Sequence, residues 1–244
     1  MKTYVFILLT TYLFLSCSSD AEKIIDRSIE LSGGNYVNHK KISFDFRDKH
    51  YVSGRKDGDF FLERIMNDST GLTKDVFNNE GFKRYLNDRL MEVPDSMAVK
   101  YANSVNSVHY FAYLPYGLND HSVNNELLEE TEIKGQVYYK IKVWFDESDS
   151  EVGDDEDIYV YWINKDTYFV DYLAYKFKVD GGGMRFREAY NPRNVGGIRF
   201  VDYNNFKPES KSASLYELDS LFESNKLVKV SEIELKNIRV DDYE

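Results

Sequence analysis

About a dozen short segments rich in β-branched and aromatic residues run through this sequence, separated by charged or glycine-containing turns. The segments lie at 41–48, 50–56, 59–66, 73–77, 82–86, 89–92, 132–134, 136–145, 157–164, 167–179, 184–190, 197–206 and 226–240. The chain has 20 Tyr and 16 Phe but only 4 Pro, a balance that suits pleated, half-buried strands. Because most turns are short, the sequence predicts a mainly β fold of the α+β class, built as an antiparallel meander.

Three helices are expected to interrupt the strands. Ser19 and Glu22 form a capping-box pattern, which predicts a helix that ends at Gly33. Ser214 begins a second capping pattern and predicts a short helix through about Phe222. The longest helix is expected from about Asp95 to Ala112, and its apolar face consists of Met97, Tyr101, Val105, Val108 and Ala112.

An aromatic-rich antiparallel sheet has an apolar concave face, and this face needs a cover. The predicted helix at 95–112 is the candidate lid, because burying its apolar face against a sheet is what stabilises such a helix. Either the helix covers the sheet completely, or helix and sheet leave a cavity between them. The sequence leaves both arrangements open.

The only cysteine, Cys17, follows the only long apolar run of the chain. That run has about a dozen mostly apolar residues after Lys2, too few to span a bilayer, which needs roughly 20. A positive start, a short apolar region and Leu15-Ser16 before the cysteine match a lipoprotein signal peptide. We therefore expect cleavage after residues 1–16 and lipidation of Cys17. The expected location is the cell envelope, with a lipid anchor in the outer membrane on its periplasmic face or at the cell surface.

Residues 17–244 are expected to form a single domain, since they contain no linker rich in proline, glycine and serine and no fixed repeat. Removing residues 1–16 takes away one charged residue, Lys2, and leaves 30 Lys+Arg against 42 Asp+Glu, a net charge of about −12. Such an acidic chain is poorly suited to nucleic acid or to an anionic leaflet. We expect a monomer, no nucleic-acid partner, and attachment to the membrane through the lipid alone.

Eight acidic residues gather in the sequence DESDSEVGDDED at 146–157. Their spacing does not match a calcium-binding EF-hand loop, and it favours a solvated turn between two strands. The four histidines lack the spacing of a zinc site, and no nucleophile elbow, phosphate loop or dinucleotide fingerprint occurs. We therefore expect no metal, no cofactor and no catalytic residues.

Three stretches and the order of the elements carry a family resemblance. The stretches are FDFRDKHY at 44–51, YVYWINKDTYFVDYLAY at 159–175 and MRFREAYNPRNVGGIRFVDY at 184–203. They are similar to those of an uncharacterised family of Bacteroidota lipoproteins, which resembles the LolA/LolB lipoprotein-carrier fold. The resemblance implies a half-open antiparallel β-barrel with an N-terminal helix and a lid helix over an apolar cavity for acyl chains. Cys17 makes the chain similar to lipid-anchored LolB, whereas no position matches the lid arginine or the cavity residues of the carriers.

Four arginines lie in the third stretch, namely Arg185, Arg187, Arg193 and Arg199. The first two share one face of the predicted strand, because side chains alternate between faces. Guanidinium groups pair well with carboxylate or phosphate, so a clamp for an anionic headgroup is one interpretation. The sequence favours the other, in which the arginines pair with local acids such as Asp171, Glu188 and Asp202.

Bulky residues occupy both faces of the predicted strands at 137–145, 158–163 and 168–179, more than a sheet with one buried face needs. Size and strand position suggest five residues for the lining of a ligand cavity: Trp144, Trp162, Phe169, Tyr175 and Phe177. The lid helix would add Met97, Tyr101 and Val105.

Three functions remain open. The chain could bind a fatty-acyl chain or a lipoprotein in lipid or lipoprotein trafficking. It could instead be a non-catalytic interaction lipoprotein of the envelope, with a barrel filled by its own aromatic side chains. The third function is that of an enzyme with an unrecognised site. The sequence slightly favours the apolar-ligand binder.

Overall fold

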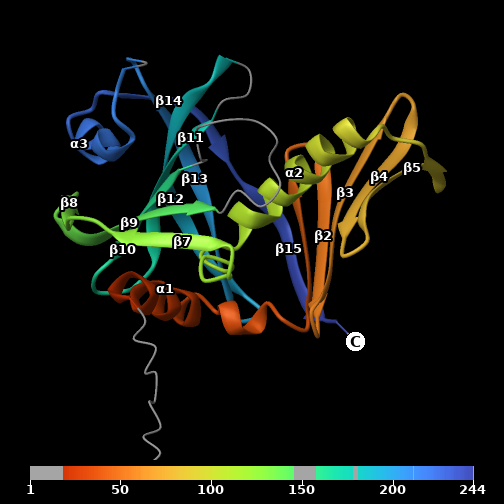
Figure 1. The fold of residues 1–244 in the computed structure, drawn as a ribbon, viewed down its shortest axis with the longest axis horizontal. Helices are drawn as coiled ribbons and strands as arrows, with labels where there is room; N and C mark the ends of the chain where they lie inside the picture. Colours follow the sequence, from red (N-terminus) through yellow and green to blue (C-terminus); the bar gives the residue numbers. More distant parts are fainter. Residues whose placement is uncertain (1–18, 146–157, 178–180, 211, 244) are drawn as a thin grey trace, which may run out of the picture.

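The computed structural model describes residues 19–145, 158–177, 181–210 and 212–243, so Cys17 and the acidic segment at 146–157 lie outside the described residues. Within these ranges, fifteen strands form two sheets (Figure 1). The first sheet has the order β15 (Leu235–Asp242), β1 (Lys40–Phe46), β2 (Lys49–Lys56), β3 (Asp59–Asp68), β4 (Gly71–Asn78), β5 (Gly81–Leu86) and β6 (Arg89–Met91). We call it the seven-stranded sheet.

The second sheet, called the eight-stranded sheet below, is antiparallel throughout, as is the first. Its order is β14 (Leu227–Ile233), β13 (Ile198–Pro208), β12 (Gly183–Val195), β11 (Val170–Phe177), β10 (Tyr159–Asn164), β9 (Gln136–Phe145) and β7 (Val123–Leu127), with β8 (Thr131–Ile133) also paired to β9. In the described residues the terminal strands are β15 and β6 in the first sheet and β14 and β7 in the second, so neither sheet closes into a barrel.

The chain passes from one sheet to the other between β14 and β15, and the buried carboxylate of Asp202 fixes this junction. One oxygen of Asp202 accepts hydrogen bonds from the Leu235 backbone N–H at 2.9 Å and from the Arg193 guanidinium at 2.8 Å. The other oxygen accepts from the Asn191 side chain at 2.7 Å. Arg193 also donates to the Leu235 carbonyl at 2.7 Å, so both backbone groups of Leu235 are held at the turn between the sheets.

The N-terminal helix α1 (Asp20–Leu31) begins and ends where the sequence indicates. Ser19 Oγ accepts from the Glu22 backbone N–H at 3.1 Å, and the Glu22 carboxylate accepts from the Ser19 N–H at 2.7 Å. Gly33 follows the helix with a φ of 80°, and a Cβ there would lie 1.9 Å from the Gly197 carbonyl oxygen. Only glycine therefore lets the end of α1 pack onto the turn between β12 and β13. The apolar face of α1 is buried in the core: Ala21, Ile24, Ile25 and Ile29.

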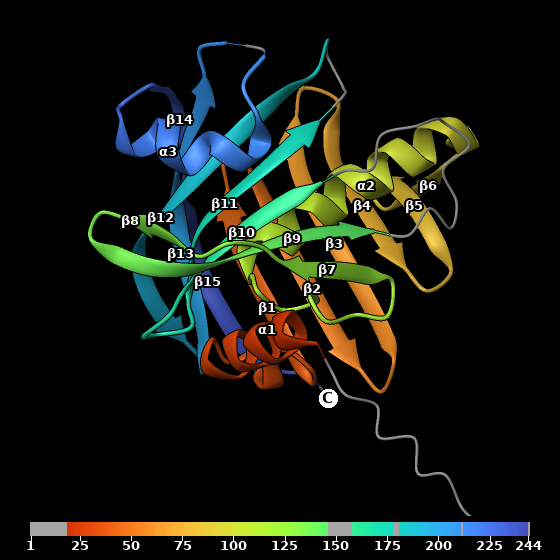
Figure 2. The ribbon, with the colours of Figure 1, turned by 60° about the vertical axis from the view of Figure 1, so that its left-hand side comes forward.

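The mid-chain helix α2 (Asp95–Ala112) has the predicted bounds and lies over the concave face of the seven-stranded sheet (Figures 1 and 2). It packs against β3, β4 and β5. Val105 is completely buried, and Val108 and Ala112 belong to the large core between the two sheets. The predicted apolar stripe therefore does face the sheet, which accounts for the length of this helix.

Both faces of the eight-stranded sheet are buried over its central strands. The inner face contributes to the large core, in which Tyr161, Ile163 and Leu173 meet α1, the end of α2 and the other sheet. The outer face carries a second core, made by Trp162 and its neighbours beneath η3 (Leu215–Glu217) and α3 (Leu218–Glu223). The two-faced burial explains why β9, β10 and β11 carry bulky residues at nearly every position.

The predicted mainly β fold with an N-terminal and a mid-chain helix is confirmed. The strands number fifteen in the described ranges rather than about a dozen. One reason is that the predicted segment 226–240 is divided between the two sheets at the Asp202 junction. The other is β7, a strand that the sequence did not indicate. No helix in these ranges combines the length and apolar content needed to cross a membrane.

Replacing Val105 by Asp should lower the free energy of unfolding by at least about 3 kcal/mol, because it places an unpaired carboxylate in a fully buried position. The matched control is Val99→Asp on the same helix, where the side chain is 60% exposed and the cost should stay within about 0.5 kcal/mol. Urea unfolding of both variants measures the difference. Equal stability of the two variants would contradict the packing of α2 on the sheet.

Candidate functional site

One cross-strand row of side chains runs under the whole length of α2. Direct register pairing places these residues opposite one another on the concave face: Phe44, Tyr51, Arg64, Asp75, Arg84 and Met91, from β1 to β6. The row changes from aromatic in the core, through charged in the middle, to apolar at the exposed edge. The N-terminal end of α2 lies over the apolar part of the row at the edge strand, and its C-terminal end lies over the aromatic part.

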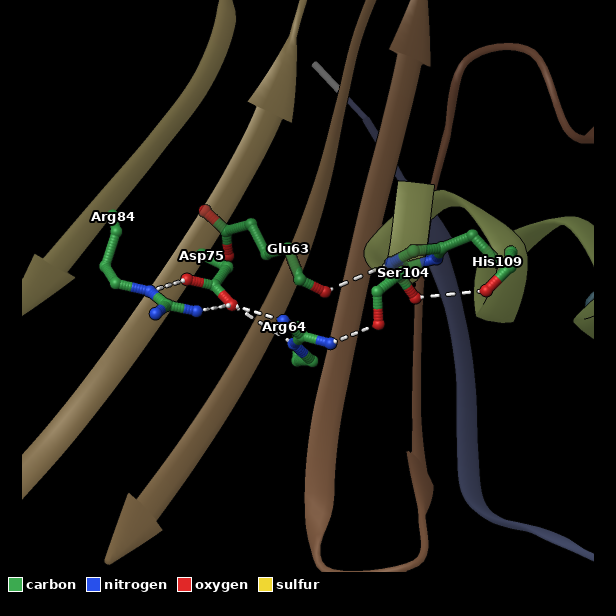
Figure 3. A network of polar contacts seen from close by, with 7 residues as sticks. Glu63, Arg64, Asp75, Arg84, Ser104 and His109 are labelled. Atoms are coloured by element: carbon green, nitrogen blue, oxygen red, sulfur yellow. Dashed lines mark hydrogen bonds and ion pairs between the residues drawn. The ribbon is translucent and has the colours of Figure 1, made fainter. Parts of the chain in front are cut away.

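The charged middle of the row ties α2 to the sheet (Figure 3). Asp75 is fully buried, and its carboxylate accepts hydrogen bonds from Arg64 at 2.6 and 3.1 Å and from Arg84 at 2.6 and 3.0 Å. Arg64 then donates to Ser104 Oγ of α2 at 2.8 Å. The hydrogen bond to Asp75 raises the pKa of Arg84, and the Arg84 guanidinium lies 3.8 Å from the centre of the Tyr101 ring. Two guanidinium groups share one carboxylate, which leaves one positive charge in excess.

His109 anchors the C-terminal part of α2 in the aromatic part of the row. Its side chain is buried, with ring centres 5.5 Å from Tyr51 and 5.7 Å from Phe44. Nε2 donates to the Glu63 carbonyl at 3.0 Å (Figure 3). Nδ1 is buried and has no hydrogen-bond partner within the described ranges. Burial lowers the pKa of His109 to about 4, so the imidazole is neutral in the folded protein at pH 7.

A groove opens between the first turns of α2 and the edge of the seven-stranded sheet. It has a volume of about 300 Å³ and is open to solvent. We call it the α2 groove, and its lining is Thr70, Thr73, Arg84, Leu86, Met91, Glu92, Val93, Pro94, Met97 and Tyr101. Most of these side chains are apolar, and its volume lies at the lower limit of ligand pockets, roughly 300–1,000 Å³. The charged row ends here, since Arg84 forms part of the lining.

The structure separates the eight predicted ligand-binding residues into several places. Met97 and Tyr101 line the α2 groove, and Val105 lies buried one turn further along the same helix. Trp144 lies on the outer face of β9, with Lys142 Nζ 4.5 Å from its ring centre. Phe169 precedes β11, beneath the Arg199 guanidinium at 4.4 Å. The predicted residues therefore do not line one common cavity.

Trp162 belongs to the filled core on the outer face of the eight-stranded sheet. Its side chain is fully buried and packs on Phe186, with ring centres 5.3 Å apart. The indole N–H donates to the Asp219 carboxylate at 3.1 Å, and the same oxygen accepts from Lys140 at 2.8 Å. These contacts hold α3 on the sheet, on the side opposite α2.

Tyr175 and Phe177 lie on the inner face of the eight-stranded sheet, within a partly exposed set of rings. We call this set the aromatic wall: Phe145, Tyr159, Tyr175 and Phe177. Successive ring centres are 5.8, 5.7 and 6.2 Å apart. The wall continues to α2, because the ring of Tyr110 lies 6.1 Å from that of Phe145.

The four arginines of the third sequence stretch divide into two pairs. Arg193 and Arg199 bind acids, Asp202 at 2.8 Å and Asp171 at 3.3 Å, as the sequence favoured. Arg185 and Arg187 lie on the inner face beside the aromatic wall, while Glu188 pairs with Lys134 instead. The ion-pair interpretation is therefore right for only half of the set.

Sequence reasoning missed the ion-pair network beneath α2. The three charged residues come from three different strands, and each looks like an ordinary solvent-facing member of an alternating strand. A weak signal did exist, because each of the three has a bulky apolar residue two positions away on its strand, such as Leu62 for Arg64 and Phe77 for Asp75. Strand register is needed to bring them together.

A second open hollow, of about 650 Å³, lies by β7 and η3 and is lined by Glu126, Leu127, Leu128, Glu129, Lys140 and Tyr216. The ammonium group of Lys140 in this hollow already has hydrogen-bond partners, because it donates to Asp219 and to the Tyr216 carbonyl. In the described part of the chain, no three acidic, histidine or cysteine side chains gather as ligands for a metal ion. This hollow therefore offers less to an apolar ligand than the α2 groove.

Comparison with protein families gives a match over residues 2–235 to a family of unknown function, DUF6503. The chain belongs to this family. DUF6503 carries no functional description, so membership by itself says nothing of a ligand. No curated protein matches the sequence.

Several solved structures resemble the DUF6503 chain at low sequence identity. A DUF1329 family protein from Desulfovibrio piger has a TM-score of 0.54 at 14% identity, with 92% of this chain and 94% of that chain covered. A LolA superfamily protein from Nitrosomonas europaea has a TM-score of 0.49 at 10% identity, with coverage of 92% and 93%. A putative outer membrane lipoprotein-sorting protein domain from Vibrio parahaemolyticus has a TM-score of 0.39 at 8% identity, with coverage of 91% and 92%. The first of these supports the two-sheet fold.

Acid should destabilise the DUF6503 protein through His109. Its pKa is about 4 when folded and about 6.5 when unfolded, so the unfolded state binds more protons between these values. The contribution is fully present above pH 6.5 and decreases as the pH falls, by roughly 2 kcal/mol between pH 7 and pH 5. Urea unfolding at both pH values should show this loss in the wild type and a smaller one in His109→Gln. The same pH dependence in both proteins would show that His109 is not the titrating group.

Proposed function

We propose that this protein is a lipid-anchored binding protein of the cell envelope, not an enzyme, which holds the apolar chain of a lipid or lipoprotein in the α2 groove. The observation that supports it is the apolar lining of this groove, to which Leu86, Met91 and Met97 contribute. An apolar surface that stays open in a folded protein commonly marks a binding site. This assignment revises the set of ligand-binding residues to those around the N-terminal turns of α2.

The position of the groove suits exchange of a ligand. It opens at the edge strand β6, where Met91 is 41% exposed, so an acyl chain can enter without separating the two sheets. Further along, α2 is fixed by the Arg64–Ser104 hydrogen bond, by Val105 and by His109. The N-terminal turns of the helix have fewer contacts of this kind, so the free energy needed to widen the groove is smallest there.

A second candidate function is a non-catalytic interaction lipoprotein with a filled interior. It is favoured by the packing between the sheets and outside them, since Tyr161 and Trp162 are at most 1% exposed. In that case a partner protein, not a lipid, would cover the apolar surface near β6. Binding measurements on the groove distinguish the two.

The membrane anchor is part of the proposal and rests on the sequence before α1. In Cys17→Ala the lipid mass should be lost and the protein should no longer be retained by the membrane through its mature N-terminus, because the acidic chain has little affinity for an anionic leaflet. Mass spectrometry and membrane fractionation measure both effects. Wild-type protein without lipid in the soluble fraction would contradict the anchor and leave the groove assignment untouched.

Binding in the groove is tested with a fluorescent fatty acid and the domain that begins at Ser18. Thr73 lines the groove from β4, so Thr73→Trp should fill it and weaken binding by at least about tenfold, or ~1.4 kcal/mol. The matched control is Lys74→Trp, which places the same indole on the opposite face of the same strand. Saturable micromolar binding that competes with unlabelled lipid is expected in the wild type and in the control.

Two results would contradict the groove assignment. One is absence of saturable binding to the wild type, which would favour the interaction lipoprotein. The other is equal affinity of the Thr73→Trp and Lys74→Trp variants, which would place the ligand elsewhere on the protein.

A further inference from the structure

We propose that Arg187 binds the anionic group of a ligand, a carboxylate, sulfonate or phosphate, whose apolar body lies on the aromatic wall. This site is separate from the α2 groove and does not depend on it. The two lie at opposite ends of α2, because Met97 lines the groove whereas Phe111 contacts Arg187. Fourteen helical residues separate them, about 20 Å along the axis.

Aromatic rings surround the Arg187 guanidinium. Its central carbon lies 5.0 Å from the ring centre of Phe111, 5.1 Å from that of Tyr175 and 5.9 Å from that of Tyr203. These rings come from α2, β11 and β13, so three elements converge on the one cation. The arrangement fixes the position of the guanidinium, since a planar cation stacks well on aromatic faces.

The hydrogen-bonding capacity of Arg187 is only partly used. One terminal nitrogen donates to the Tyr175 hydroxyl at 2.9 Å, while Nε is buried and has no hydrogen-bond partner among the residues that the structure describes. On the adjacent strand β13, Asn205 is paired directly with Arg187 in register, and its buried Oδ1 also has no hydrogen-bond partner in the described part of the chain. Unsatisfied polar atoms of this kind cost free energy unless a ligand or water completes them.

Arg187 also lacks a counter-ion among the described residues, unlike four other arginines whose side chains are buried or half-buried. Arg64 and Arg84 share Asp75, Arg193 binds Asp202, and Arg199 binds Asp171. A cation partly removed from water without a nearby carboxylate is unfavourable, and folded proteins rarely keep one for structure alone. An external anion would supply the missing charge.

The surroundings of Arg187 match a ligand with a charged end and an apolar body. Tyr175 both accepts its hydrogen bond and belongs to the aromatic wall, whose rings are partly exposed. Arg185, two residues earlier on the same face, lies 4.8 Å above Phe177 at the far end of the wall. It donates to the Met184 carbonyl and has no acid partner within the described ranges, so a second guanidinium group lies beside the wall.

The test compares two dyes of similar shape, the anionic anilinonaphthalene sulfonate and the neutral phenylnaphthylamine. The wild-type domain from Ser18 should bind both dyes. Arg187→Gln should weaken the binding of the sulfonate dye by about tenfold, while its affinity for the neutral dye should change little. Arg239→Gln, an exposed arginine on β15, is the control and should change neither. An unchanged preference for the sulfonate in Arg187→Gln, or equal weakening of both dyes, would overturn the proposal.

Displacement experiments distinguish the sources of the anionic group. Decanoate should displace the sulfonate dye from the wild type at lower concentration than inorganic phosphate does, because only decanoate also covers the aromatic wall. Equal displacement by both would contradict the role of the wall. Arg187→Lys keeps the charge and should retain part of the sulfonate preference.

Thermal unfolding without ligand separates binding from a structural role. Arg187→Gln should melt at the same temperature as the wild type or higher, since it removes a half-buried cation that has no acid partner among the described residues. Arg193→Gln should melt several degrees lower, because it breaks the junction at Asp202. If Arg187→Gln lowered the melting temperature as much as Arg193→Gln does and left the dye preference unchanged, the role of Arg187 would be structural.

Discussion

The carboxylate of Asp202 holds the point at which the chain leaves one sheet and enters the other. Its two oxygens accept three hydrogen bonds, from Asn191, Arg193 and the backbone of Leu235. β14 ends at Ile233 and pairs with β13 in one sheet, whereas β15 begins at Leu235 and pairs with β1 in the other. The angle between the sheets, the core between them and the position of α2 all depend on that turn. One buried, fully hydrogen-bonded carboxylate thus has consequences across the whole domain.

The concave face combines two kinds of contact under one helix. Apolar side chains such as Val105 and Val108 supply most of the driving force for packing, while the Arg64–Asp75–Arg84 network fixes where the helix lies. A buried ion pair contributes little net stability compared with apolar packing, but breaking it is costly, so it favours one position of the helix over its alternatives. The groove is confined to the N-terminal end of α2 for this reason. Its lining is the part of the concave face that the fixed helix does not cover.

The pattern of the sequence was sufficient for the secondary structure, and much less so for the candidate site. A capping pattern predicted α1, apolar residues at helical spacing predicted α2, and alternation predicted most strands. These signals are local, since each depends on residues close together in the chain. The eight predicted ligand-binding residues were chosen by size, and size does not reveal which face of a strand is enclosed. Trp162 is therefore in a filled core, whereas Met97 and Tyr101 line a groove. The charged row was missed because its members come from separate strands.

Composition and local pattern alone determined that this chain is mainly β, acidic, and equipped with an N-terminal helix and one long amphipathic helix. They also indicated a lipoprotein signal that ends at Cys17. Only the tertiary structure decided which arginines have acid partners, since the sequence favoured ion pairs for the whole set, yet Arg193 lies at the Asp202 junction and Arg187 beside the aromatic wall. The physical reason is register: side-chain direction alternates along a strand, but its surroundings depend on residues far away in the chain. Whether an arginine has an acidic partner depends on such distant residues. This distinguishes the arginines that stabilise the fold from those that are available to a ligand.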